Sequence, residues 1–192
     1  MIETPAAGDE RDRALVRRCL EGEVAAAGEL VDRYQRRLFN LALRMLGNVQ
    51  DAEDVTQTVF GKAFHALGTY DPTFRFLSWI YRMTVNESLN ALKRRKPTVT
   101  LDDDLGLEAA GYTPDAAKET EERVGLALMN LRPDDRAVVV LRHFASFSYD
   151  EIAGVLEVPA RTVKSRLFTA RQRLRVALLQ QDPATNGRMH SR

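Results

Sequence analysis

Residues Phe147 to Arg175 read FSYDEIAGVLEVPARTVKSRLFTARQRLR, and this stretch decides the fold of the C-terminal part of the chain. Ser148 and Glu151 have the spacing of a capping box, in which each side chain satisfies a backbone N–H of the first helical turn. A short helix with Ile152, Ala153, Val155 and Leu156 on its apolar face follows. Pro159 disfavours helix at the preceding residue but suits a first helical turn. The pattern predicts two helices joined by a tight turn, the second starting near Ala160.

The second of these helices combines an apolar stripe with a basic face. The stripe recurs at spacings of four, three and four residues, as a buried helix face does, and consists of Val163, Leu167, Ala170 and Leu174. The residues that face partly or wholly outward are Arg161, Thr162, Lys164, Ser165, Phe168, Thr169, Arg171 and Arg175. A basic helix face can serve solubility alone. The capping box, proline turn and basic helix in this order favour a DNA-binding helix-turn-helix.

Composition and charge bound the possible functions of the 192-residue chain. Lys and Arg number 28 and Asp and Glu 27, but residues 97–125 carry 2 basic and 8 acidic side chains, a net charge of −6. An acidic segment therefore separates two basic ones. Cys19 is the only cysteine, which excludes an intrachain disulfide and a cysteine-cluster zinc site. The sequence shows neither an apolar run of membrane-spanning length nor a signal-peptide pattern. We therefore expect the protein in the cytoplasm.

The N-terminal half shows helical periodicity and no strand-like alternation. We expect helices over residues 13–20, over a longer segment that ends at Gly47, from Asp51 onward, and from about Phe74 to Arg95. These elements predict a helical bundle over residues 11–96, with Leu20 among the buried positions of the first helix. Residues 1–10 and 180–192 are expected to be disordered, and 97–120 to form a flexible acidic linker to a second helical domain over 121–179. The predicted fold class is all-α.

Three motifs carry a resemblance to a known family. Residues 51–57 read DAEDVTQ, residues 76–82 read FLSWIYR with Asn86 after them, and Leu131-Arg132-Pro133 precedes TVKSRL at 162–167. In this order they resemble bacterial RNA polymerase sigma factors of the extracytoplasmic-function (ECF) class of the sigma-70 family. The resemblance covers residues 11–96 and 121–179. It implies region 2 in the first domain, region 4 in the second, and a role in promoter-specific transcription initiation.

The resemblance implies specific partners. Asp51, Glu53, Asp54 and Gln57 would dock on the coiled-coil of the polymerase beta-prime subunit, and region 4 would meet the beta flap. An anti-sigma factor is a further expected partner. The same carboxylates could also be a solvated helix start, since the helix dipole favours them there. A metal site is disfavoured because no histidine lies nearby at ligand spacing.

Promoter contacts are implied in both domains. The residues expected at the −10 element are Tyr70, Asp71, Phe74, Asn86, Asn90, Lys93, Arg94 and Arg95. The loop over residues 68–73 would capture a flipped-out base. The neighbouring aromatics are more often core residues in a helix of this size, and we expect Trp79 in the core. The residues expected at the −35 element are Arg161, Thr162, Lys164, Ser165, Arg166, Phe168, Thr169 and Arg171. Glu157 departs from the family pattern, which often has glycine at this turn position.

Two other classes of function compete with this interpretation. A helix-turn-helix regulator with a sensor domain explains residues 147–175 but not the motifs of the first domain. An enzyme is disfavoured because His65, His143 and His190 are scattered, with no nucleophile or phosphate loop beside them. We therefore predict no catalytic residue, no cofactor and no metal.

Overall fold

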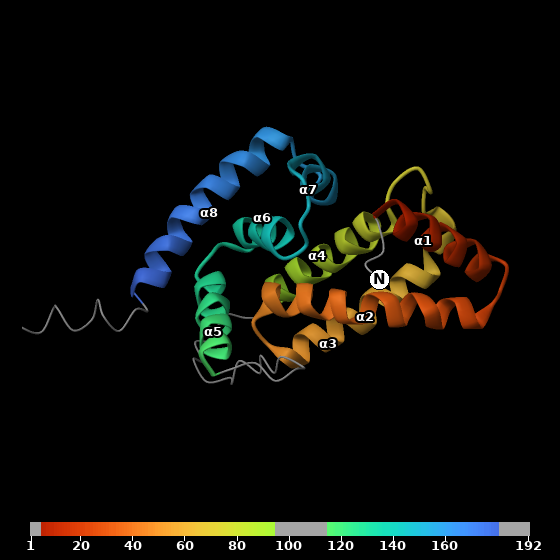
Figure 1. Ribbon diagram of the computed structural model, residues 1–192, viewed down its shortest axis with the longest axis horizontal. Coiled ribbons are helices and arrows are strands. Elements are labelled where there is room, and N and C mark those ends of the chain that lie inside the picture. Colours follow the sequence, from red (N-terminus) through yellow and green to blue (C-terminus); the bar gives the residue numbers. More distant parts are fainter. Residues whose placement is uncertain (1–4, 95–114, 181–192) are drawn as a thin grey trace, which may run out of the picture.

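The computed structural model describes residues 5–94 and 115–180. Within these ranges every regular element is helical and none is a strand, which confirms the all-α prediction (Figure 1). The elements are α1 (Pro5–Leu20), α2 (Val24–Leu46), α3 (Val49–His65), the 3-10 turn η1 (Leu67–Thr69), α4 (Phe76–Arg94), α5 (Asp115–Met129), α6 (Pro133–His143), α7 (Tyr149–Leu156) and α8 (Ala160–Gln180). No helix in the described part of the chain is long and apolar enough to cross a membrane.

The first domain is a bundle in which α2 packs against α1, α3 and α4 (Figure 1). The turn from α2 to α3 is set by two adjacent residues. Gly47 has a φ of 69° and ends α2, and its N–H donates to the Leu43 carbonyl at 2.8 Å. The Asn48 side chain then accepts a hydrogen bond from Asp51 N at 2.9 Å and caps α3. A left-handed C-cap followed by an N-cap side chain folds the chain back within two residues.

The first helix begins at Pro5, so the prediction of disorder over residues 1–10 is wrong for residues 5–10. The reason is that acidic residues of this helix have basic or hydroxyl partners elsewhere in the domain. Asp12 is 2% exposed and accepts hydrogen bonds from Tyr34 Oη and, at 2.7 Å, from Arg33 Nε. Burial raises the pKa of Asp12, although both partners oppose this effect. Leu20, predicted to be buried, is instead exposed at the end of the helix.

The second domain contains α5 to α8, and α6 and α7 pack across α8. Pro133 opens α6, and Asp135 in its first turn is fully buried. The Asp135 carboxylate accepts from Arg132 Nε and Arg173 Nη1, each at 3.0 Å, so it ties the start of α6 to α8. The predicted linker over 97–120 lies largely outside the described residues, and its last part, from Asp115, is helical in α5.

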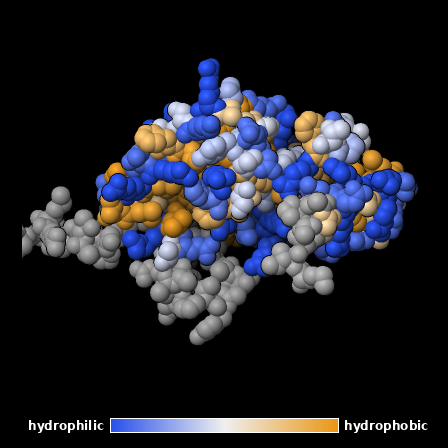
Figure 2. Space-filling view, turned by 45° about the horizontal axis from the view of Figure 1, so that its top comes forward, coloured by the Kyte–Doolittle hydropathy of each residue, from blue (hydrophilic) through white to orange (hydrophobic). Residues whose placement is uncertain are grey.

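The two domains lie against each other. Helices α2 and α4 of the first domain contact α5, α6 and α7 of the second, and Figure 1 shows α6 and α7 directly above α4. Buried apolar residues of both domains form one cluster. Hydrophobic residues also gather on the surface at the end of the molecule where α8 ends beside α5 (Figure 2), and the exposed ones there include Leu126, Val176 and Leu179.

Candidate nucleic-acid interface

The helix-turn-helix has the capping box that its sequence predicts. Ser148 Oγ accepts from the Glu151 backbone N–H at 3.2 Å, and the Glu151 carboxylate accepts from the Ser148 N–H at 2.8 Å. Burial by itself raises the pKa of Glu151, but the hydrogen bonds with Ser148 and the charge of Arg75 outweigh burial and hold this pKa below its usual range. The start of α7 is therefore rigid, which orients the turn that follows it.

The turn between α7 and α8 depends on Glu157. This residue has a φ of 53° and a ψ of 43°, the left-handed conformation that glycine adopts most readily. Its N–H donates to the Ala153 carbonyl, and the Val158 N–H reaches the same carbonyl at 3.1 Å. The geometry explains why glycine suits this position, and it makes Glu157 a strained residue in an otherwise regular motif.

Helix α8 has the predicted division between a buried and an exposed face. Val163, Leu167 and Ala170 are at most 1% exposed, and Leu174 is half-buried. On the opposite face, Phe168 is 67% exposed. The other exposed residues of this face are Arg161, Lys164, Ser165, Arg171 and Arg175, and Thr162 and Thr169 are half-buried. Basic and aromatic side chains thus project from a helix that is packed on its other side.

Some cations near this face already have partners within the protein. Arg166 is half-buried and forms an ion pair with Asp134 at 3.6 Å, so in this conformation it is not free to meet DNA. Lys164 Nζ lies 5.8 Å from the centre of the Tyr149 ring, and Arg171 Nη2 lies 3.4 Å from Nε2 of His143. Burial lowers the pKa of His143, and the charges of Arg171 and Arg142 lower it further.

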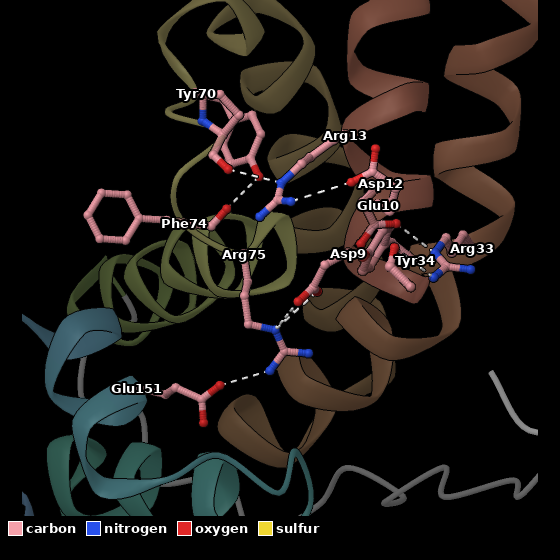
Figure 3. Close-up of polar contacts among 12 residues, drawn as sticks. Asp9, Glu10, Asp12, Arg13, Arg33, Tyr34, Tyr70, Phe74, Arg75 and Glu151 are labelled. Atoms are coloured by element: carbon pink, nitrogen blue, oxygen red, sulfur yellow. Dashed lines mark hydrogen bonds and ion pairs between the residues drawn. The ribbon is translucent and has the colours of Figure 1, made fainter. Parts of the chain in front are cut away.

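A second candidate surface is the loop between η1 and α4, which is held by hydrogen bonds among its own residues and by one from α1 (Figure 3). Asp71 Oδ1 accepts from Thr73 N at 2.9 Å and from Thr73 Oγ1 at 2.7 Å, and these bonds hold the pKa of Asp71 below its usual range. Arg13 Nε of α1 donates to the Pro72 carbonyl at 3.0 Å. At the end of this braced loop the Phe74 ring points away from the domain and is 67% exposed.

Tyr70 differs from its predicted role. Its side chain is 8% exposed and its ring packs against those of Phe76 and Trp79, with centroids 5.4 and 5.5 Å away. In this conformation the ring is not available to stack on a base, so Tyr70 supports the loop from inside. Trp79 is half-buried and packs against the core, which agrees with the prediction that it is a core residue.

The remaining predicted contacts lie on the surfaces of α3 and α4. Asn86 and Asn90 are both exposed, one turn apart on α4, and Lys93 and Arg94 are exposed at the end of the same helix. Arg95 lies outside the described residues. On α3, Glu53, Asp54 and Gln57 are exposed and Asp51 is half-buried. Asn86 and Asn90 thus lie on α4, and Phe74 lies on the loop before it. The acidic residues lie on a different helix, α3.

Sequence reasoning missed Arg13 and Arg75, two cations that organise the loop. Arg13 lies on α1, 59 residues before the carbonyl it contacts. Arg75 donates from Nε to Asp9 at 3.1 Å and from Nη1 to Glu151 at 2.8 Å. No local pattern signals such partners, because all of them are distant in the sequence.

Comparison with known proteins agrees with this architecture. The family model described as Sigma-70 region 2 matches residues 30–98, and the one described as Sigma-70, region 4 matches residues 121–174. The RNA polymerase sigma-H factor of Pseudomonas aeruginosa is 34% identical over 185 residues, which cover 88% of this chain and 94% of that protein. The chain belongs to the RNA polymerase sigma factors.

Two further similarities refine this assignment. The ECF RNA polymerase sigma-E factor of Escherichia coli (strain K12) is 32% identical over 177 residues, covering 84% of this chain and 91% of that protein. CnrH, solved in complex with the cytosolic domain of CnrY, matches with a TM-score of 0.70 and 28% identity over 90% of this chain and 99% of its own. The protein is thus a sigma factor of the ECF class, and sigma factors are not enzymes.

Proposed function

We propose that this sigma factor reads duplex DNA at the −35 element with the exposed face of α8. The observation that carries the proposal is the division of this helix, whose one side is fully buried while Lys164, Ser165 and Phe168 project outward. A packed helix with polar and cationic outward side chains fits the major groove, where such groups reach base edges. Arg161 and Arg171 flank them and would hold phosphates, which position a protein without reading sequence.

The loop before α4 and the exposed side of α4 would bind the melted −10 element. Phe74 offers a free ring on a braced loop, and single-stranded bases are held chiefly by stacking on such rings. Asn86 and Asn90 supply amides that can pair with base edges, and Lys93 and Arg94 supply charge for the backbone. A loop braced in advance loses little entropy on binding, which helps to offset the cost of extruding a base.

Core polymerase would bind the acidic part of α3. Glu53, Asp54 and Gln57 project from one rigid helix, and Asp51 adjoins them in its first turn. Charges in a fixed array speed the encounter with a basic partner and set its register. We assign this surface to the beta-prime coiled-coil and the second domain to the beta flap.

An anti-sigma factor is a further proposed partner. The solved complex of the similar CnrH with the cytosolic domain of CnrY supports regulation of this chain by another protein. The proposed place of action is the cytoplasm, where polymerase and promoter DNA occur together. The negative charge of the acidic segment disfavours direct contact with DNA. We therefore assign this segment to the interior of the polymerase.

Run-off transcription tests the proposal. Core polymerase with this protein should initiate at a subset of a genomic promoter library, and neither component alone should do so. Promoter DNA should be bound well only when core polymerase is present. Tight binding of a two-fold operator by the protein alone would instead identify an ordinary helix-turn-helix regulator.

A further inference from the structure

Helix α1 contacts the −10 loop (residues 70–75) at two points (Figure 3). Arg13 Nε donates to the Pro72 carbonyl at 3.0 Å, in the middle of the loop. Asp9 lies one helical turn before Arg13, and both of its carboxylate oxygens accept from Arg75 Nε at 3.1 Å, at the end of the loop. Because residues four positions apart lie on one face of a helix, a single face of α1 holds the loop.

The part of α1 that meets the loop is itself fixed to α2. Leu15 and Val16 pack into the core of the domain. Asp12 is buried, and its carboxylate accepts hydrogen bonds from Tyr34 Oη and Arg33 Nε of α2. Leaving a buried carboxylate without its partners is costly, so these bonds oppose any shift of α1 along α2. Helix α1 is therefore a fixed support for the loop.

Aromatic packing connects the same support to the start of the loop. The Tyr34 ring, whose hydroxyl donates to Asp12, packs edge-on against Phe76 with centroids 5.4 Å apart. Phe76 is buried and packs in the same way against Tyr70, the first residue of the loop, also at 5.4 Å. Close-packed interiors transmit small displacements. The position of Tyr70 thus also depends on where α1 lies.

The middle of the loop has little support of its own. Residues 71–74 are all exposed, and the hydrogen bonds within this segment run from Thr73 and Phe74 to Asp71. A segment with exposed backbone bonds and few buried contacts opens at a low cost in free energy. Contacts from outside the segment therefore decide how far it moves, and Arg13 supplies one of them to Pro72.

We propose that Asp9 and Arg13 are positioning residues of the −10 site, through which α1 sets the choice among −10 sequences. The inference rests on the proposed function, since it needs the loop to bind the melted −10 element. A site rejects a wrong base only if it cannot adapt to that base, and mobile surfaces do adapt and become promiscuous. A loop held by α1 keeps Phe74 and its neighbours in one place, and a released loop would accept more sequences.

Arg13→Ala and Asp9→Ala test the proposal, because they change the net charge in opposite directions. Any effect of charge on DNA would separate the two variants, whereas loss of positioning acts in the same direction in both. Arg11→Ala and Glu21→Ala repeat the two charge changes at exposed positions as matched controls. Arg13→Lys and Asp9→Asn keep a donor and an acceptor, so their effects should lie between those of the alanine variants and wild type.

Hydrogen exchange of the protein alone gives the first readout. The backbone amides of Thr73 and Phe74, both bonded to Asp71, should exchange about 2- to 10-fold faster in Arg13→Ala, the factor expected for loss of one hydrogen bond. Asp9→Ala should act in the same direction, but less strongly, because Arg75 keeps its contact with Glu151. Both controls should exchange as wild type does. Unchanged exchange in both alanine variants would overturn the proposal without any use of DNA.

Run-off transcription from a promoter library with a random −10 element and a constant −35 element gives the second readout. The preference of the holoenzyme for its best −10 sequences should fall by about 2- to 10-fold in both alanine variants, and affinity for core polymerase should not change. Lower stability in urea with an unchanged −10 preference would make the two residues merely structural and overturn the proposal. An equal loss on all sequences with Arg13→Ala and a gain with Asp9→Ala would show charge alone, which also overturns it.

Wild type separates failure of this inference from failure of the proposed function. If wild type with core polymerase showed no preference among −10 sequences, the proposed function of the loop would fail, and the inference with it. If wild type selected −10 sequences and both alanine variants selected the same ones to the same degree, only the role of α1 would fail.

Discussion

Tyr70 Oη donates a hydrogen bond to the main-chain oxygen of Phe74 at 2.6 Å, across the loop that precedes α4. The donor is a buried ring of the domain core, and the acceptor belongs to a residue whose own ring is exposed. The bond therefore ties the main chain at Phe74 to the packed core, and this tie limits where the exposed Phe74 ring can lie. It also gives the two aromatics distinct roles that substitution can separate.

Tyr70→Phe should mainly lower stability, whereas Phe74→Ala should mainly lower activity. Tyr70→Phe keeps the ring but loses one hydrogen bond, which should cost about 1 kcal/mol of unfolding free energy. Phe74→Ala should leave stability within about 0.5 kcal/mol, because the ring is exposed, yet it should impair promoter opening more strongly. Urea denaturation and permanganate footprinting of the holoenzyme measure the two effects. Normal opening by Phe74→Ala would remove this ring from the −10 site.

The exposed amides of α4 should act in melting and not in duplex binding. Replacement of Asn86 and Asn90 by alanine should reduce opening around −10 while protection of the −35 element persists. Both side chains are exposed, so helix content should not change. Gln172→Ala on α8 is a control on the other domain. If the double variant opened a linear promoter as well as wild type, this face would have no −10 role.

The acidic face of α3 should set affinity for core polymerase. Asp54→Ala with Gln57→Ala removes two exposed side chains and should weaken holoenzyme assembly while circular dichroism stays unchanged. Gln50→Ala, at the exposed start of the same helix, is the matched control. Unaltered affinity of the double variant in a titration with core polymerase would contradict the docking assignment.

Helix α8 should separate stability from base recognition. Leu167 is 1% exposed, so Leu167→Ala should cost about 2–5 kcal/mol in urea denaturation. Lys164→Ala and Phe168→Ala should leave stability nearly unchanged and alter which −35 sequences are selected from a library, since a well-formed base contact carries ~1–3 kcal/mol of discrimination. Arg171→Ala should weaken all sequences alike and reduce the salt slope by about one. Equal loss across the library with Lys164→Ala and Phe168→Ala would show that they read no bases.

Stability should depend on pH through His143. Its folded pKa lies below the ordinary 6.5, because burial and the charges of Arg171 and Arg142 disfavour the imidazolium. The unfolded chain therefore binds the proton more readily, and the stability that neutral His143 contributes is complete above pH 6.5 and is lost as pH falls through the folded pKa. His143→Gln should reduce this loss in urea titrations on either side of pH 6.5. The same dependence in the variant would assign it to other groups.

The sequence by itself determined the helices and the faces they bury. The capping box of Ser148 and Glu151, the stop at Gly47 and the stripe through Val163 and Leu167 all lie in the structure where spacing predicted them. These features depend on residues within a few positions of one another, so local hydrogen bonding and helical periodicity suffice to specify them. The family motifs are similarly local, and they were enough to identify a sigma factor.

Only the tertiary structure decided what depends on partners distant in the sequence. Helix α1 extends back to Pro5 because Tyr34 and Arg75, 22 and 66 residues away from their acceptors, donate hydrogen bonds to the carboxylates of Asp12 and Asp9. Tyr70 is a core residue because the fold of its loop places its ring against Phe76 and Trp79, which local spacing does not indicate. The contact of Arg82 with Glu157 spans 75 residues and two domains. No periodicity encodes such pairs, because their energy appears only once both elements are folded and brought together.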